Sequence, residues 1–248
     1  MTESTTIKPQ SPVGAVQSVI SEQKHSIGWV TFLLAWVAGF CDTATFISGD
    51  AIFSAHVTGN FIVFAAQIVS GSGHPASWIK LLTFPVFVIA VITGGWMVSK
   101  TRSRYTILLV EGIILVCCGV LAHVLFNRAG GEFTVYFIVM LTVFAMGLQN
   151  AFGKLFAKET YGPTTMMTGN VTQIALDLGG ILRPGTVNAG ESLKNFRKQL
   201  ITIGGFLAGC VAGALFARWW GLVVIVMPGI AMVLCYIMGE AAKNKGRA

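Results

Sequence analysis

The sequence has 248 residues, of which 54% are hydrophobic and only 11% are charged. Soluble domains carry roughly 25% charged residues, and the mean hydropathy here is +0.73, so a water-soluble fold could not bury this much apolar surface. The formal net charge is +7, but Lys and Arg stand in short blocks between apolar runs and at both ends. We therefore expect no nucleic-acid partner and interpret the charge as a membrane-topology signal.

The chain begins with a polar segment that lacks the apolar core of a signal peptide, so we expect residues 1–26 to form a disordered cytoplasmic tail. A single membrane domain should follow at 27–239, and a basic cytoplasmic tail at 240–248. Six runs approach the roughly 20 apolar residues that a helix needs to cross a bilayer. They are 27–47, 79–99, 105–126, 133–153, 200–217 and 221–239. The predicted fold is an all-α integral membrane protein with six long transmembrane helices.

Two shorter apolar segments each contain the same three residues. Thr58-Gly59-Asn60 lies in the segment 51–69, and Thr168-Gly169-Asn170 lies in the segment 164–182. In each half a long helix ends in a polar pair, a stretch with glycine or proline follows, and Thr-Gly-Asn then opens the short segment. This order predicts an internal duplication, with halves of about 27–126 and 133–239.

The two short segments could either cross the membrane or enter and leave it on one side. If both are re-entrant, six helices cross, and 14 of the 17 basic residues lie inside, leaving Lys80, Arg128 and Arg218 outside. If both cross, the eight spans leave 11 basic residues inside and 6 outside. The positive-inside rule favours the first arrangement. Three spans in each half would then give the halves inverted topologies, with both termini in the cytoplasm.

The glycine-broken segments are the first candidates for a binding site. Unpaired backbone groups are costly in a bilayer, so such segments survive where protein or water surrounds them. Both Thr-Gly-Asn motifs would present backbone amides at a helix start, which attracts anionic groups. Asn170 and Gln173 have the spacing of a capping box, which predicts a helix start at that point. The alternative is that both motifs only cap and pack their helices, and it is equally favoured.

Two of the acids in the predicted membrane domain are candidates for a polar site. Asp42 is roughly 22 Å along the first span, where a carboxylate must be paired, protonated or hydrated. Its repeat partner is Asn150, and Asp177 corresponds to Gln67 in the first half. We predict that Asp42 or Asp177 faces a polar cavity with the Thr-Gly-Asn segments. An interfacial charge that reaches headgroups or water is the alternative, and it is stronger for Asp177.

Other residues carry weaker expectations. Glu111 should reach toward the basic block near Arg104 at the membrane interface. His56 could titrate near neutral pH or simply form a hydrogen bond at the membrane boundary. Glycines at 205, 209 and 213 form a close-packing stripe that could also serve oligomerisation through a second copy. The substrate-binding candidates are Asp42, His56, Thr58, Gly59, Asn60, Gln149, Asn150, Thr168, Gly169, Asn170 and Asp177.

The five cysteines form no C-x-x-C pair and the histidines lack metal-ligand spacing. No catalytic motif is present either. We therefore expect no metal, no cofactor and no enzymatic activity, although residues scattered over several helices could still build an intramembrane active site.

With these residues in view, the chain resembles the YoaK-like family of bacterial integral membrane proteins, a domain of unknown function. The resemblance rests on Gly39-Phe40-Cys41-Asp42, the run at 53–60 and the second Thr168-Gly169-Asn170. The family pattern is matched at Asp42, Phe53, His56, Thr58, Gly59 and Asn60. The resemblance implies a location in the bacterial inner membrane and gives no substrate.

The function favoured by this pattern is a small secondary transporter in the lipid bilayer. The motifs would bind a small polar or anionic solute, while Asp42 or Asp177 would take up a coupling proton or cation. A channel with the duplicated loops at its constriction is an alternative. A membrane enzyme, or a partner subunit without transport activity, is the other.

Overall fold

The computed structural model describes residues 12–71, 76–101, 103–129, 131–183 and 189–245, and the regular elements in these ranges are helices. Six of them have 20 residues or more: α1 (Pro12–Ser48), α3 (Ile79–Lys100), α4 (Thr106–Ala129), α5 (Glu132–Leu155), α7 (Ala189–Trp220) and α8 (Val226–Lys245). The shorter α2 (Gly59–Val69) and α6 (Met167–Leu182) and the 3-10 helices η1 (Ala157–Glu159) and η2 (Gly221–Ile225) complete the described fold.

Several helices have the length and composition of membrane spans. Five stretches of the described chain qualify: Ile27–Ser48, Ile79–Lys100, Thr106–Leu125, Glu132–Leu155 and Ala189–Glu240. The last of them contains α7, η2 and most of α8. Large apolar side chains such as Ile62, Val69 and Leu182 are more than 70% exposed, and so many exposed apolar groups would be a liability in water. The chain is therefore a helical membrane protein.

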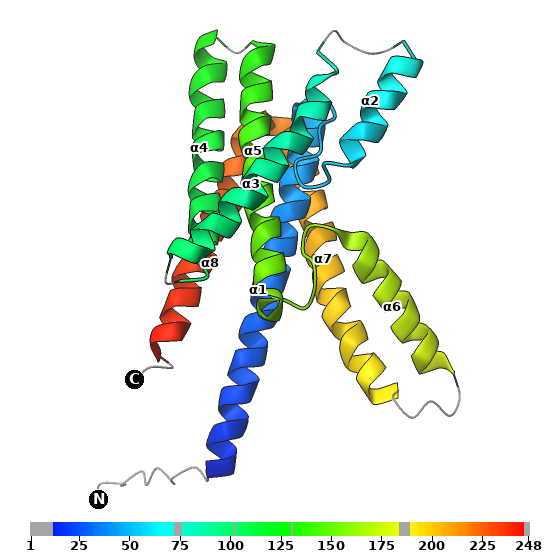
Figure 1. The fold of residues 1–248 in the computed structure, drawn as a ribbon, viewed down its shortest axis with the longest axis vertical. Coiled ribbons are helices and arrows are strands. Elements are labelled where there is room, and N and C mark those ends of the chain that lie inside the picture. Colours follow the sequence, from blue (N-terminus) through cyan, green and yellow to red (C-terminus); the bar gives the residue numbers. More distant parts are fainter. Residues whose placement is uncertain (1–11, 72–75, 102, 130, 184–188, 246–248) are drawn as a thin grey trace, which may run out of the picture.

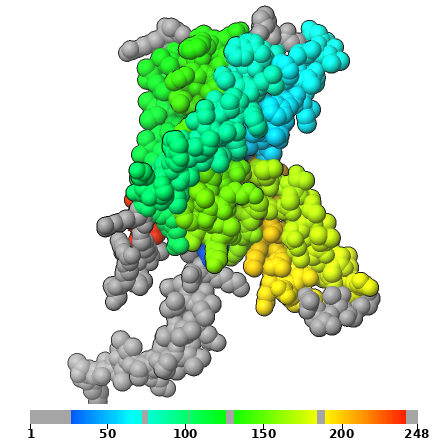
Figure 2. Space-filling model, viewed as in Figure 1, coloured from blue at the N-terminus to red at the C-terminus, as the bar shows by residue number. Residues whose placement is uncertain are grey.

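The helices pack in two crossing pairs and a third pair beside them. α1 lies along α7, α3 crosses α5, and α4 packs against both α5 and α8. Figure 2 shows α3 running diagonally across the front face. At the α1–α7 crossing, Gly205, Gly209 and Gly213 lie against the backbone of α1, and a Cβ on Gly209 would be 2.1 Å from the carbonyl oxygen of Trp36. The glycine stripe considered for oligomerisation is thus covered by α1 of the same chain.

Both short helices turn back toward the end of the molecule from which their segment came. In Figure 1, α1 rises to the upper part of the molecule, α2 begins nearer the middle and rises again, and α3 then descends from the top. The second half does the reverse, because α5 descends, α6 begins near the middle and descends, and α7 rises from the lower end. Each loop and short helix together form a hairpin that returns toward the end from which the chain came.

Three helix boundaries differ from those expected from the sequence. α1 begins at Pro12, so residues 12–26 are helical rather than a disordered tail, and residues 1–11 lie outside the described ranges. α8 likewise extends to Lys245. α6 begins at Met167, which places Asn170 inside the helix, so the capping-box interpretation with Gln173 is wrong. The amide of Asn170 is engaged elsewhere, by the carbonyl oxygen of Pro163.

Candidate functional site

The loop before α2 is tied to the end of α1 by one carboxylate. Asp42 is buried, and its Oδ1 accepts hydrogen bonds from the backbone N–H of Ala55 at 2.5 Å, the N–H of His56 at 3.3 Å and the hydroxyl of Ser54 at 3.4 Å. Its Oδ2 pairs with Nδ1 of His56. The loop therefore supplies hydrogen-bond partners for the Asp42 carboxylate. An acid inside a membrane protein needs such partners.

The His56 side chain, which pairs with Asp42, also packs against two aromatic rings. Its ring meets Phe206 of α7 edge-on, with the centroids 5.6 Å apart, and also contacts the ring of Phe53. The hydrogen bond that His56 donates to Asp42 raises the pKa of His56 above its ordinary value, although partial burial acts in the opposite direction. His56 and Asp42 consequently form an ion pair over more of the pH range than a free histidine would allow.

Asn60 fixes the same loop through its amide. Oδ1 accepts from the backbone N–H of Phe53 at 2.7 Å, and Nδ2 donates to the carbonyl oxygen of Phe53 at 2.8 Å and to the hydroxyl of Thr83 at 3.0 Å. Asn60 is fully buried. These bonds satisfy backbone groups of an irregular segment, so the first Thr-Gly-Asn motif has a structural use.

In the second half, α5 and α6 hold the loop between them by similar contacts. Asn170 donates to the carbonyl oxygen of Pro163 at 2.7 Å, and this pair has the same sequence separation as Asn60 and Phe53. Asn150 donates to the hydroxyl of Thr165 at 2.9 Å. Gln149 donates through Nε2 to the hydroxyl of Thr164 at 3.2 Å and to the backbone of α1 at 2.7 Å. Both loops are therefore anchored to the preceding long helix.

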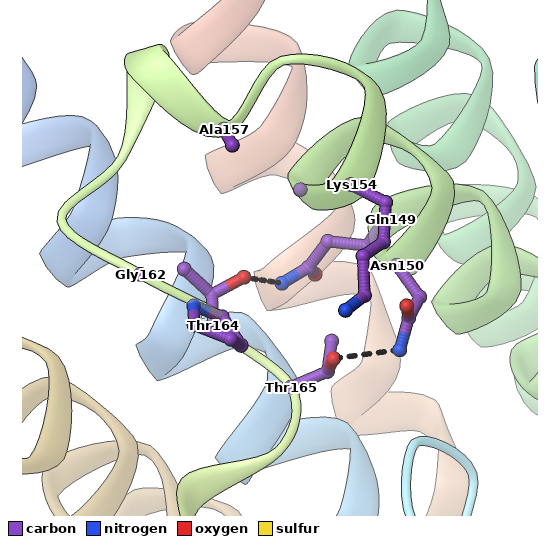
Figure 3. A pocket seen from close by; sticks show the side chains of 9 residues that line it. Gln149, Asn150, Lys154, Ala157, Gly162, Thr164 and Thr165 are labelled. Atoms are coloured by element: carbon purple, nitrogen blue, oxygen red, sulfur yellow. Dashed lines mark hydrogen bonds between the residues drawn. The ribbon is translucent and has the colours of Figure 1, made fainter. Parts of the chain in front are cut away.

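A cavity of about 130 Å³ lies between the end of α5 and this second loop. Its lining consists of Gln149, Asn150, Gly153, Lys154, Ala157, Gly162, Pro163, Thr164 and Thr165. In Figure 3, Gln149 and Asn150 point from α5 toward the two threonines of the loop. A cavity of ~150 Å³ accepts benzene, so a solute of about six non-hydrogen atoms fits.

The cavity has two unused polar features. The Oε1 atom of Gln149 is buried and has no hydrogen-bond partner among the described residues. The exposed Lys154 adds a cationic group to the lining. A buried acceptor without a donor is costly, so a ligand or water that donates to Gln149 would satisfy it. A negatively charged ligand group would suit Lys154.

The structure places the candidate residues from the sequence at two different loops. Gln149 and Asn150 line the cavity, while Asp42 and His56 pair with each other at the other loop. Thr58, Thr168 and Gly169 are exposed, Gly59 packs beneath the ring of Phe53, and Asn60, Asn170 and Asp177 are buried. The cavity lining includes neither Asp42 nor Asp177. One oxygen of Asp177 has no hydrogen-bond partner within the described chain.

Sequence reasoning missed Lys154 and the pair Thr164 and Thr165. The two threonines precede the second Thr-Gly-Asn motif by the same distance as Ser54 and Ala55 precede the first. Extending the comparison of the two halves backward from the motifs would have found them. Lys154 was counted only as a topology signal, because its place at the cavity depends on how the loop folds back.

Glu111 does not reach the basic block, so that expectation is wrong. Arg104 instead pairs with Glu159 at 2.7 Å, and the hydroxyl of Tyr105 donates to the same carboxylate at 2.7 Å. Glu111 is fully buried in α4. The face of α4 that carries it is covered by neighbouring helices, so the side chain has no path to the interface in this conformation.

The fold and these contacts define a class: an all-helical membrane protein in which two irregular loops, each leading to a short helix, are anchored to the long helix before them. The chain belongs to the family described as protein of unknown function (DUF1275), whose model matches residues 30–238. The match confirms the prediction of a family of unknown function. No curated protein and no solved structure matches the chain.

Proposed function

We propose that this protein is a small secondary transporter that carries a small polar or anionic solute through the cavity beside α5. The observation that carries the proposal is the buried, unpaired Oε1 of Gln149 in a polar cavity next to Lys154, at a break in the helical structure. Binding sites of transporters are commonly built where helices are interrupted. The link from this architecture to transport is an argument by analogy.

An inverted repeat is part of the proposal. The packing is reciprocal, since α1 pairs with α7 of the other half and α5 pairs with α3, while α4 and α8 pair with each other. The two short helices point toward opposite ends of the molecule in Figure 1. In this arrangement six helices cross the membrane, α7 and α8 as separate spans, and both termini lie in the cytoplasm of a bacterial cell.

The two halves differ in a way that suits alternating access. In the first half the carboxylate of Asp42 closes directly on the loop amides. In the second half Asn150 reaches only the hydroxyl of Thr165, and the cavity lies beside it. A carrier opens its site to one side at a time. The described conformation is then the one open toward the end that carries Lys154.

Ligand-dependent thermal stability of the purified protein tests this proposal. Small carboxylates, hydroxy acids, amino acids and inorganic anions would be screened against wild type and Lys154→Ala. The matched control is Lys158→Ala, which removes the same charge from exposed η1 outside the cavity lining. A solute at 100 times its Kd stabilises the protein by about 2.7 kcal/mol.

We expect a stabilising solute to act on wild type and Lys158→Ala and to lose most of its effect on Lys154→Ala. The same solute should enter proteoliposomes with saturable kinetics. Flux that does not saturate would indicate a channel instead. A ligand that stabilises all three proteins equally would show that this cavity is not the binding site.

A further inference from the structure

One buried acid, Glu111, takes no part in the contacts described so far. Glu111 lies in α4 within the apolar stretch Thr106–Leu125, and its side chain is fully buried. Neither of its carboxyl oxygens has a hydrogen-bond partner among the described residues. Asp42 is different, because loop amides and an imidazole compensate it.

The surroundings of Glu111 favour a neutral carboxyl group. Two thiols lie near it, those of Cys41 in α1 and Cys235 in α8. The adjacent Gly112 packs tightly, since a Cβ there would be 2.9 Å from the carbonyl oxygen of Gly229 in α8. An ionised carboxylate without partners in such a place is strongly disfavoured, and a group so placed neutralises by binding a proton.

A metal ion is a poor alternative occupant. The described residues contain no group of three His, Cys, Asp or Glu side chains that could hold a metal ion. None of the salt bridges in the described chain involves Glu111 either. A proton is therefore the cation that this site fits.

We propose that Glu111 is a proton-binding site that is protonated in this conformation and releases its proton when α4 separates from α8. The step is the dissociation of the carboxyl O–H, with the proton passing to water and the electron pair staying on the carboxylate. This inference rests on the proposed function for what the proton drives, namely solute movement. Proton binding itself requires no solute.

A polar network at the same end of α4 offers a place for exchange with water. Tyr105, about 1.7 helical turns from Glu111, donates to Glu159, which also pairs with Arg104. Cys235 of α8 lies near both Tyr105 and Glu111. A small separation of α8 from α4 would thus connect Glu111 with this network.

Infrared spectroscopy of the protein in lipid nanodiscs tests the proposal. A protonated carboxyl group gives a C=O stretching band that the ionised form lacks. Spectra of wild type and Glu111→Gln would be compared across a pH series, with Glu132→Gln as the control because Glu132 is exposed in the first turn of α5. The alkylation rate of Cys235 would be followed in parallel.

We expect a carboxyl band at neutral pH in wild type and Glu132→Gln that Glu111→Gln lacks. On raising the pH the band should disappear reversibly, while Cys235 in wild type reacts faster than in Glu111→Gln. If Glu111→Gln fails to fold, Glu111→Asp gives the second test, since it should shift both the band and its midpoint.

Two outcomes would overturn the proposal. Identical carboxyl bands in wild type and Glu111→Gln would mean that Glu111 is ionised. A band that persists, with unchanged Cys235 reactivity, throughout the pH range of the folded protein would mean a fixed structural proton. Neither outcome depends on the solute screen with Lys154→Ala, so the two proposals fail separately.

Discussion

Asn60 and Asn170 make the same kind of contact in opposite halves of the molecule. Each donates a hydrogen bond through Nδ2 to the main-chain carbonyl group seven residues earlier, which belongs to Phe53 in one case and to Pro163 in the other. In both cases the acceptor lies in an irregular loop that leads to a short helix. A buried asparagine can thereby supply the bonds that a helix would have supplied to its own backbone.

Replacing either asparagine with alanine should destabilise the protein. Each change removes the partner of a main-chain carbonyl group in a loop, which costs about 1–3 kcal/mol where that group is buried. Asn60→Ala should be the more severe, because it removes two bonds to Phe53 and one to Thr83. The measurement is the apparent unfolding temperature in detergent, with the exposed Thr168→Ala as control. Wild-type stability in Asn60→Ala would show that water replaces the amide without loss.

The α1–α7 crossing predicts a sharp contrast between two glycines of α7. A Cβ at Gly209 would lie 2.1 Å from the carbonyl oxygen of Trp36, whereas a Cβ at Gly204 would have nothing within 4 Å. Gly209→Ala should therefore force the helices apart and cost about 1–3 kcal/mol. Gly204→Ala should be neutral or slightly stabilising, because alanine favours the helix.

Purified yield and unfolding temperature of the two glycine variants would test this contrast. Both changes add the same methyl group to the same helix, so intrinsic helix propensity cannot separate them. Equal behaviour of the two variants would contradict the close approach of α1 and α7.

The pair of His56 and Asp42 predicts a pH-dependent stability. The pKa of His56 is raised in the folded protein, so proton binding favours the folded state. This contribution is complete below the unfolded pKa of about 6.5 and is lost as the pH rises through the folded value. The stability difference between wild type and His56→Gln should therefore be largest in mildly acidic buffer and shrink toward alkaline pH.

Unfolding temperatures measured across this pH range would test the prediction, with His123→Gln as control because His123 is exposed on α4. A difference for His56→Gln that is constant with pH would mean that the ring contacts with Phe53 and Phe206, rather than the charge, account for its effect.

Much of the fold could be predicted because a bilayer restricts the chain to helices. Apolar length located each long helix. Both short helices turn back toward the end from which their segment came, as Figure 1 shows. That they re-enter the membrane, as the basic residues favour, stays a prediction. The ends of the helices were harder to predict from the sequence. The polar residues 12–26 continue α1, since a helix can extend beyond the apolar core that identifies it in a sequence.

Only part of the candidate site could be predicted from the sequence, because the rest depends on how the loop folds. Gln149 and Asn150 were found because polar residues near the end of an apolar helix are conspicuous. Their neighbour Lys154 was not, since only the folded loop brings Thr164 and Thr165 back to α5. Glu111 was misplaced because sequence gives the depth of a residue along a helix but not which face its neighbours cover.

The turn after α1 provides the last test, through the ion pair between Lys80 and Asp50. Lys80 Nζ lies 2.6 Å from Asp50 Oδ2, with the lysine side chain fully buried and the aspartate side chain 34% exposed. Asp50 and Ala51 have positive φ angles of 57° and 54°. Asn tolerates that conformation, so Asp50→Asn removes the negative charge without disturbing the turn.

Asp50→Asn should destabilise the protein by leaving the buried ammonium group of Lys80 without its counter-charge. The loss should be smaller than the ~3–5 kcal/mol of a fully buried pair, because water reaches part of residue 50. Adding Lys80→Met removes the stranded charge and should recover stability relative to Asp50→Asn alone. A double-mutant cycle on the two changes measures the coupling directly. If the two effects simply add, the pair contributes nothing, and the position of Lys80 must be explained by packing alone.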